Sequence, residues 1–530
     1  MTHPVQAVSS AIGAAGFDPR AQQLTSLFQG ANDGPAKVAA RITGLQQGGK
    51  RADDAPYFTN NEGIPFPDAA HSKTAGGLPL VSDTFLLQKQ QHFNRSKNLE
   101  RMGHIAGGSG AFGYFETTKD MSSFCKAHFL RGSGVTTPVF VRFSTVTFGR
   151  EFPDSGRNPR GFAIKFYTGE GPDVIRSQSR NPRNFLLDYN SLFDLLANTP
   201  EGVNGEGKFV YIKYHFLADH GQRQFTWDEA VRMSGEDPDY SKRDLWSAIE
   251  NGEKISWTAH VQIMEPEEAD AVKLGFDPFD VTKVWPRDRF PMHEFGKLIL
   301  NKNPENFHRD VEQAAFSPGS MVPGIEDSPD PLLQFRMFFY RDAQYHRIGI
   351  NLHQVPVNCP FMAQSYSSLN FDGPLRVDAN HAMNPQYTPN SFVHKFRPDT
   401  AEARYQTADK TVGRGSHFYH EGTLSEYEQP RELYKRVMTA QARDHLHRNT
   451  AGALRLVDDV VIQTKYLAQL YLIDPEYARG VYELLPEKKF EFSTVEEKSV
   501  GAEKAGKEPK FLPGSDSERL LGVPISSSYG

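Results

Sequence analysis

The chain is poor in cysteine, with only Cys125 and Cys359 among its 530 residues. Two thiols cannot build a disulfide framework or a zinc site, so a reducing compartment is the default expectation. No apolar run approaches the roughly 18 residues that a membrane-spanning helix needs, and we expect no secretory signal. The formal net charge of −6 gives no reason to expect nucleic acid or a membrane surface as a partner.

Aromatic residues are plentiful by contrast, and 38 of them are phenylalanine. A flat apolar cofactor needs aromatic and aliphatic walls, but a large β-core uses phenylalanine equally well. Composition alone leaves both interpretations open.

Alternating apolar and polar residues predict several half-buried strands. We expect them at 137–145, 161–168, 208–216 and 255–264. Residues 226–251 are typical of helices, with a turn at 239–242. Turn residues close each run and no strand–helix–strand rhythm appears. The predicted class is therefore α+β, with an antiparallel barrel and helices packed outside it.

The segment with the clearest chemistry is RMFFYRDAQYHRIG at 336–349. Helical spacing places Arg336, Tyr340 and Arg347 on one stripe, and Gly349 ends the helix. A cation beside a phenol favours the phenolate and lowers a pKa that is ordinarily about 10. A phenolate is a good ligand for ferric iron. The same spacing also fits a half-buried tyrosine between arginines whose charged ends reach water.

The neighbouring sequence decides between these two interpretations. Residues 313–326, QAAFSPGSMVPGIE, and residues 354–361, QVPVNCPF, flank the helix. Together with it they closely resemble the proximal side of the haem catalases, in which a tyrosine ligates the iron. The resemblance implies that Tyr340 is that ligand, that Arg336 supports it, and that Arg347 pairs with a haem propionate.

A second segment resembles the distal side of the same family. Breaking a bound peroxide requires a base that takes a proton and returns it, and histidine is suited to this. Residues 101–116, RMGHIAGGSGAFGYFE, resemble the catalase distal motif. On that likeness Arg101 matches a propionate ligand and His104 the acid–base residue. Without the family, a histidine near glycines is more often an ordinary loop residue.

The strand that follows carries two further matches. In RFSTV at 142–146, Arg142 matches a second propionate ligand and Ser144 the hydroxyl that holds the histidine. The distal match also departs from the family. Gly103 stands where the family usually has valine, and one extra residue lies between His104 and Phe112. Counting back from Phe112 would put Ile105 over the iron, unless a bulge in the glycine turn absorbs the difference.

Two parts of the family pattern are missing. After Gly171 the chain skips the segment with the family's distal asparagine, and Asn181 and Asn184 stand in the wrong context to replace it. A second jump follows Val203 and omits barrel strands that carry part of the family's NADPH pocket. Val284 and Trp285 match its other half, where core packing explains them as well, so NADPH is a doubtful cofactor.

The missing strands have two expected consequences. A barrel that loses strands must close again around a smaller pocket or expose unpaired edges. Loss of a preorganised polar contact such as the distal asparagine costs about 3–4 kcal/mol in the reaction barrier, or a few hundredfold in rate. We therefore expect haem binding to survive better than full-speed dismutation.

The resemblance spans roughly residues 56–490 and implies a haem catalase of the shorter-subunit, monofunctional type. Its substrate would be hydrogen peroxide and its products water and oxygen. Two alternatives stay open: a catalase-like peroxidase or oxygenase acting on an organic substrate through a remodelled distal pocket, and an inactive homologue that serves assembly. The sequence does not specify the haem type. The resemblance implies a homotetramer, with a dimer as the alternative, in the cytoplasm or the peroxisome. The C-terminal residues, SSYG, lack the simple Ser-Lys-Leu peroxisomal signal.

The predicted division of the chain follows these motifs. We expect an N-terminal extension at 1–55, an arm at 56–100, the haem-binding barrel core with its proximal helix at 101–363, a wrapping segment at 364–425, a helical subdomain at 426–486 and a disordered tail at 487–530.

Overall fold

The computed structural model separates into two compact units, residues 1–69 and 70–530. The residues that it describes all belong to the second unit. They are 71–75, 78–79, 84–96, 107–145, 152–156, 160–168, 171–177, 200–221, 225–361, 372–379, 383, 412–416 and 426–507. The predicted extension at 1–55 lies outside them, as do most of the wrapping segment and the residues Arg101 and His104. The predicted domain boundaries stay predictions, apart from the tail.

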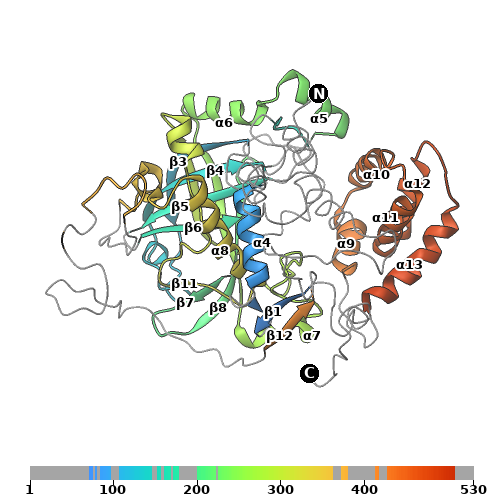
Figure 1. Cartoon of the computed structure of the whole chain (residues 1–530), viewed down its shortest axis with the longest axis horizontal. Helices are drawn as coiled ribbons and strands as arrows, with labels where there is room; N and C mark the ends of the chain where they lie inside the picture. The colour runs from blue at the N-terminus through green and yellow to red at the C-terminus, as the bar shows by residue number, and fades with distance from the viewer. Residues whose placement is uncertain are drawn as a thin grey trace, which may run out of the picture. The chain divides into compact units, whose positions relative to one another are not determined.

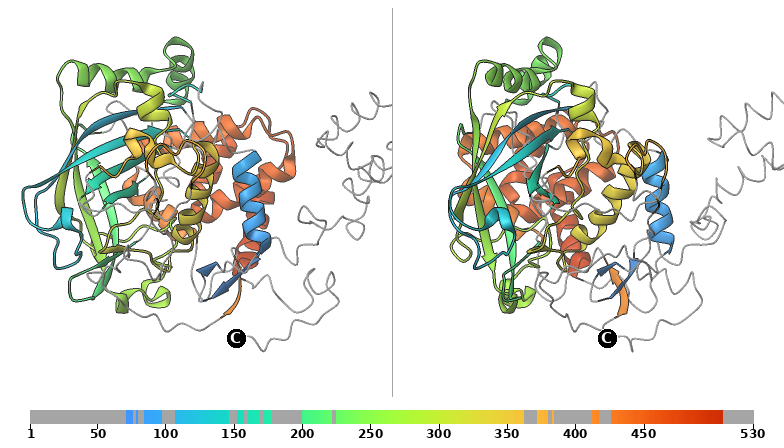
Figure 2. Two further views of the ribbon diagram at one scale, coloured as in Figure 1. Left: turned by 60° about the vertical axis from the view of Figure 1, so that its left-hand side comes forward. Right: turned by 90° about the vertical axis from the view of Figure 1, so that its left-hand side faces the viewer.

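The centre of the described chain is one antiparallel sheet of nine strands, coloured from cyan to yellow-green in Figures 1 and 2. In sheet order the strands are β11 (Ile325–Glu326), β7 (Glu201–Val203), β8 (Phe209–Ala218), β9 (Ile255–Met264), β10 (His293–Lys302), β3 (Gly108–Thr117), β4 (Val135–Ser144), β5 (Gly161–Thr168) and β6 (Gly171–Ser177). The sheet curls, so the predicted α+β class with an antiparallel, partly closed barrel is confirmed.

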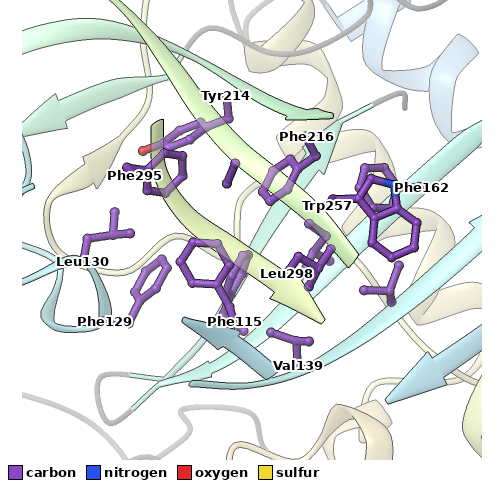
Figure 3. Packing of buried hydrophobic residues seen from close by; sticks show 14 of the residues in the cluster. Phe115, Phe129, Leu130, Val139, Phe162, Tyr214, Phe216, Trp257, Phe295 and Leu298 are labelled. Carbon is purple, nitrogen blue, oxygen red and sulfur yellow. The ribbon is translucent and has the colours of Figure 1, made fainter. Parts of the chain in front are cut away.

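The predicted strands form because each has an apolar face against the core, and β5 and much of β4 are buried on both faces. Along β9 the residues Ile255, Trp257 and Ala259 are buried, while the residues between them are only partly covered. These side chains belong to the main hydrophobic core, where Phe143 and Phe162 stack with ring centres 5.6 Å apart. Figure 3 shows this core as a layer of aromatic and branched side chains between the strands.

The sequence that follows the first missing segment forms a strand. Strand β6 pairs with β5 from Gly171 opposite Thr168 to Ser177 opposite Phe162. It also approaches β8 on the far side of the curl. Within the described residues no ladder joins β6 to β8. Strand β6 therefore pairs with the edge of β5 that the missing segment would otherwise leave unpaired. The barrel stays partly open.

The ladder between β3 and β4 includes the glycines of the distal motif from Gly108 onward. Its register runs without a break from Gly108 opposite Ser144 to Thr117 opposite Val135. Along β10, the other neighbour of β3, the register shifts between Leu300 and Lys302, opposite Gly113 and Phe112. The bulge in the glycine turn stays a prediction. Residues 101–106 lie outside the described part of the chain.

Helices lie around the sheet. Before it come α4 (Thr84–Ser96) and the small strands β1 (His71–Ala75) and β2 (Leu78–Pro79). Strand β1 pairs with β2 on one side and with β12 (Val412–Ser416) on the other. Inserted between strands are α5 (Trp227–Glu236), α6 (Tyr240–Glu250), α7 (Ala271–Leu274) and the short helices η2 (His128–Leu130), η4 (Pro266–Glu268) and η5 (His308–Glu312). After β11 come α8 (Pro331–Arg347), η6 (Leu352–Gln354) and η7 (Pro356–Asn358).

The predicted pair of helices between β8 and β9 is confirmed, but its turn lies earlier than predicted. Thr226 caps α5 through a reciprocal pair of bonds with Glu229. Helix α5 ends at Glu236 and α6 begins at Tyr240, so the turn spans 237–239 rather than 239–242. Pro238 lies between the two helices, has no backbone N–H and disfavours a helical residue before it, which places the break there.

The C-terminal helices form their own hydrophobic core. They are α9 (Glu428–Glu432), η8 (Leu433–Val437), α10 (Ala440–Leu454), α11 (Val460–Ile473), α12 (Pro475–Glu483) and α13 (Phe492–Lys507). These helices follow one another from residue 428 to residue 507. The disordered tail predicted from 487 onward is wrong for 492–507, because Phe492 and Val495 of α13 are buried in this core. No helix in the described ranges is long and apolar enough to span a membrane.

Candidate functional site

Helix α8 carries the tyrosine singled out by the sequence, and its two ends have clear causes. The buried Asp330 side chain accepts bonds from the backbone N–H groups of Leu332 (2.9 Å) and Leu333 (3.1 Å), which caps the helix. Pro331 follows at the first helical position, where a missing N–H costs nothing. The helix stops at Ile348, and Gly349 adopts a φ of +115° that favours glycine.

Arg336 and Tyr340 lie one helical turn apart and are in contact, as the spacing predicts. The Arg336 guanidinium carbon is 5.1 Å from the centre of the Tyr340 ring, and its Nη2 donates to the phenol oxygen at 3.5 Å. Arg336 is buried, whereas Tyr340 is half-buried. The contact places a positive charge directly against the phenol.

Arg347 continues the same stripe and turns toward a neighbouring backbone stretch. Its Nη2 donates to the carbonyl oxygen of Ala314 at 2.9 Å, and its Nη1 donates to that of Glu312. These bonds fix the planar guanidinium in one orientation. Carbonyl acceptors hold the group without cancelling its positive charge.

Arg142 reaches the same stretch from the sheet. It is buried on β4, and its Nε donates to the carbonyl oxygen of Val311 at 3.2 Å. Two arginines that are 205 positions apart in the sequence (347 minus 142) are thus held by neighbouring carbonyls of one short segment. Among the predicted site residues, Arg336 and Tyr340 are thus in direct contact, whereas Arg142 and Arg347 bond to separate carbonyls of the same backbone segment.

Ser144 lies two residues after Arg142, at the end of β4. Side chains two apart on a strand point to the same face, so the hydroxyl and the guanidinium share one side of the sheet. The next residue, Thr145, bonds to the carbonyl of Gly107, three positions after His104 in the sequence. Arg101 and His104 themselves lie outside the described residues, as do Asn181 and Asn184.

Sequence reasoning missed a buried lysine at this site. Lys165 of β5 donates from Nζ to the carbonyl of Ala315 at 2.7 Å and to the Asn358 side-chain oxygen at 3.3 Å. The ammonium lies 5.3 Å from the centre of the Phe316 ring. Burial, with a smaller effect of the Arg341 charge, lowers the pKa of Lys165 to about 7.

Tyr167 lies two residues further along β5. Its hydroxyl donates to the carbonyl of Val357 at 2.6 Å. Burial first, and then the charge of Asp310, raise the pKa of this phenol well above its ordinary value. Tyr167 therefore stays protonated and acts as a structural donor.

The comparisons with known proteins agree with this arrangement. A family model described as Catalase matches residues 59–172 and 201–394, more than half of the chain. The chain belongs to the catalase family. A second model, described as Catalase-related immune-responsive, matches residues 421–485, within the helical subdomain. The catalase match is interrupted at 173–200, where the sequence departs from the family pattern.

Individual catalases match along nearly their whole length. Catalase-A of Dictyostelium discoideum is 37% identical over 477 residues, covering 80% of this chain and 95% of that protein. The peroxisomal catalase of Toxoplasma gondii is 39% identical over 478 residues, covering 80% and 94%. The solved structure of catalase A from Saccharomyces cerevisiae superimposes with a TM-score of 0.63 at 30% identity, covering 82% of this chain and 99% of that one.

Family membership confirms the predicted reaction class. Catalases dismute hydrogen peroxide to water and oxygen, and they do so with haem. The comparisons do not favour the peroxidase or oxygenase alternative, nor an inactive homologue. The residues described here fit a haem group, because they offer one phenol oxygen for iron and arginines for carboxylates.

The two residues matched to an NADPH pocket differ in their surroundings. Trp285 is fully buried, and its indole N–H donates to the carbonyl of Pro278 at 3.2 Å. Val284 is 48% exposed, and its backbone N–H and carbonyl both bond to the Gln429 side chain. Core packing accounts for Trp285, and contact with the helical subdomain accounts for Val284.

Proposed function

We propose that Tyr340 is the proximal iron ligand of this haem catalase and that Arg336 keeps its phenol anionic. The contact between the two side chains on α8 is the observation that supports this assignment. A guanidinium beside a phenol stabilises the negative charge that an iron ligand needs. Bound haem would supply the two-electron redox chemistry of the reaction.

The arginines Arg101, Arg142 and Arg347 would bind the two haem propionates. Arg142 and Arg347 are supported by their shared attachment to residues 311–314, which fixes both guanidiniums. A planar guanidinium of fixed orientation is the best available partner for a carboxylate, because it donates two parallel bonds. The assignment of Arg101 rests on the family likeness.

His104 would be the acid–base residue and Ser144 the hydroxyl that orients it. His104 would take a proton from one oxygen of hydrogen peroxide and return it to the departing oxygen, which leaves as water. A second peroxide would then give up two electrons and two protons and leave as oxygen. Two peroxides thus yield two waters and one oxygen. Ser144 is supported by its position on the Arg142 face of β4.

The missing distal asparagine would slow this reaction. We infer turnover about a few hundredfold below that of catalases with the full distal segment, because a preorganised polar contact to peroxide is lost. Oxygen evolution by the purified protein, measured beside an intact relative, would test this. Equal turnover would show that another group has replaced the asparagine.

Tyr340→Phe tests the central assignment. The variant keeps the ring and removes the oxygen, so we expect loss of most haem, of the ferric-phenolate absorbance and of oxygen evolution. Tyr345→Phe is the matched control, since Tyr345 lies on the same helix with Arg341 at 5.8 Å from its ring. The control should keep normal haem content. Normal haem content and activity in Tyr340→Phe would show that the iron is held elsewhere.

The assembly is proposed to be a homotetramer, located in the cytoplasm or the peroxisome. Family membership supports an oligomer, and the relative from Toxoplasma gondii is described as peroxisomal. Native mass spectrometry of the purified protein would give a mass of four chains, and a mass of two chains would overturn the tetramer. Imaging of the tagged protein would distinguish the two locations.

A further inference from the structure

We propose that Lys165 is a positioning residue that sets Arg142 and Arg347 for the carboxylates of the cofactor by holding the backbone at 311–316. The inference rests on the proposed function, because it takes these two arginines as the carboxylate ligands. The proposal adds Lys165, which would act on Arg142 and Arg347 through the backbone segment to which both bond. Lys165 itself need not touch the cofactor.

The register of the sheet places Lys165 beside Arg142. In the ladder between β4 and β5, Lys165 lies opposite Phe140 and Ala163 lies opposite Arg142. Opposite residues of an antiparallel pair share a face, as do residues two apart on one strand. Lys165 and Arg142 therefore point to the same side of the sheet, where the segment 311–316 covers them.

This segment is held at every carbonyl. Six consecutive backbone oxygens each accept a bond from a side chain of another element. The donors are Arg142 to residue 311, Arg347 to residues 312 and 314, Asn358 to residue 313, Lys165 to residue 315 and Gln344 to residue 316. A shift of the segment would therefore move the acceptors of both arginines together.

Lys165 and Asn358 form the firmest part of this attachment. The Asn358 side-chain oxygen accepts from the backbone N–H of Ala315 at 2.8 Å as well as from Lys165, while Lys165 also bonds to the Ala315 carbonyl. Both polar groups of Ala315 are thus fixed between the sheet and η7. Ala314, which holds Arg347, is the adjacent residue.

A buried lysine with a purely structural role would make similar contacts, and Lys213 serves as the example for comparison. Lys213 is also buried in the sheet, donates to one backbone carbonyl, that of Lys283 at 3.1 Å, and lies 4.9 Å from the centre of the Trp285 ring. Burial lowers the pKa of both lysines. Lys213 differs from Lys165 in that its partners are remote from the segment 311–316.

The experiment measures haem release from the holoenzyme to excess apomyoglobin for Lys165→Met and Lys213→Met. Each substitution keeps the length of the side chain and removes the donor. We expect Lys165→Met to release haem about tenfold faster than the unaltered protein, the effect of losing one hydrogen bond to a charged group. Lys213→Met should release haem at the unaltered rate, although both lower the melting temperature. Equal release rates for the two variants would overturn the proposal.

Two further variants make the result decisive. Arg347→Met distinguishes failure of this proposal from failure of the proposed function. If Arg347→Met retains haem normally, the assignment of Arg347 to a haem carboxylate fails. If Arg347→Met releases haem fast while Lys165→Met releases it normally, only the role of Lys165 is refuted. Asn358→Ala removes the other attachment of Ala315. If Lys165→Met does not fold, fast haem release from Asn358→Ala supports the proposal and normal release overturns it.

Discussion

The Arg95 guanidinium lies 2.6 Å from the carboxylate of Asp342, so helix α4 is joined to helix α8 two residues beyond Tyr340. Asn94 strengthens this junction by donating to the other carboxylate oxygen at 3.0 Å. Figures 1 and 2 show α4 (blue) alongside α8 (yellow). The junction thus joins α8 to the helix that precedes Arg101 and His104 in the sequence.

Asp342→Ala should destabilise the protein because it leaves Asn94, which is only 2% exposed, without its carboxylate acceptor. We expect the free energy of unfolding to fall by about 1–3 kcal/mol. Arg95→Ala is the control, since the Arg95 side chain is 50% exposed and a pair of this kind contributes less than about 1 kcal/mol. Thermal unfolding followed by circular dichroism would measure both. A larger loss in Arg95→Ala would contradict the importance given to Asn94.

The elements that the sequence predicts best are those whose residues all obey one period. Strand β9 spans Ile255–Met264 as predicted, because its apolar residues alternate from Ile255 to Val261. Helix α8 ends at Arg347, two residues before Gly349, which the sequence identifies as the stop of the helix. In both cases the local sequence pattern agrees with the face that is buried. Tertiary contacts therefore do not change the structure that the pattern predicts.

The failures have physical causes in particular residues. The strand at 161–168 alternates, so Lys165 reads as a polar residue facing water, but its side of the sheet is covered by residues 150 positions later. Only long-range packing reveals that. Helix α13 was obscured by its charges, because Glu and Lys runs are as typical of an exposed helix face as of a disordered tail. The buried Phe492 and Val495 distinguish the two.

Gly480→Ala should destabilise the C-terminal helices, because a methyl group there would lie 2.4 Å from Nδ1 of His447. The ring cannot easily move, since its Nε2 is bonded to the Tyr434 hydroxyl at 2.9 Å and the ring stacks on Tyr477. We expect a loss of about 1–3 kcal/mol from this overpacking. Hydrogen exchange of peptides from α10 and α12 would report the loss.

Gly452→Ala is the matched control in the same helical core. It lies on α10 with no atom within 4 Å of the added methyl group. Alanine should therefore stabilise the helix by about 0.5–1 kcal/mol through its better helix propensity. Opposite signs for the two substitutions are expected. The same sign for both would show that the His447 ring has room to yield.

Acid should weaken the sheet through His215. Burial, followed by the charge of Lys213, lowers the pKa of this imidazole to about 4, and its Nε2 lies 3.0 Å from the Gln262 side-chain oxygen. The unfolded chain takes up the proton near pH 6.5, whereas the folded chain remains neutral until about pH 4. Stability is therefore complete above pH 6.5 and falls as the pH drops toward 4, by about 1–3 kcal/mol in all.

The variant His215→Gln tests this origin, because glutamine can still bond to Gln262 but does not titrate. Urea unfolding followed by tryptophan fluorescence, which reports on the buried Trp257 of the neighbouring strand, would be compared at pH 7 and pH 4.5. The difference in stability between the two pH values should shrink in the variant. An unchanged difference would assign the acid sensitivity to other groups.

Val495→Ala should loosen the C-terminal helical core even though it lies beyond residue 487. Val495 is completely buried, so removing its two methyl groups should cost about 2 kcal/mol. Val500→Ala on the same helix is the control, because Val500 is 71% exposed and the change should cost less than about 0.5 kcal/mol. Hydrogen exchange across α11 and α13 would measure both. Equal protection in the two variants would mean that α13 contributes nothing to that core, and the tail predicted from the charge pattern would then be the better description.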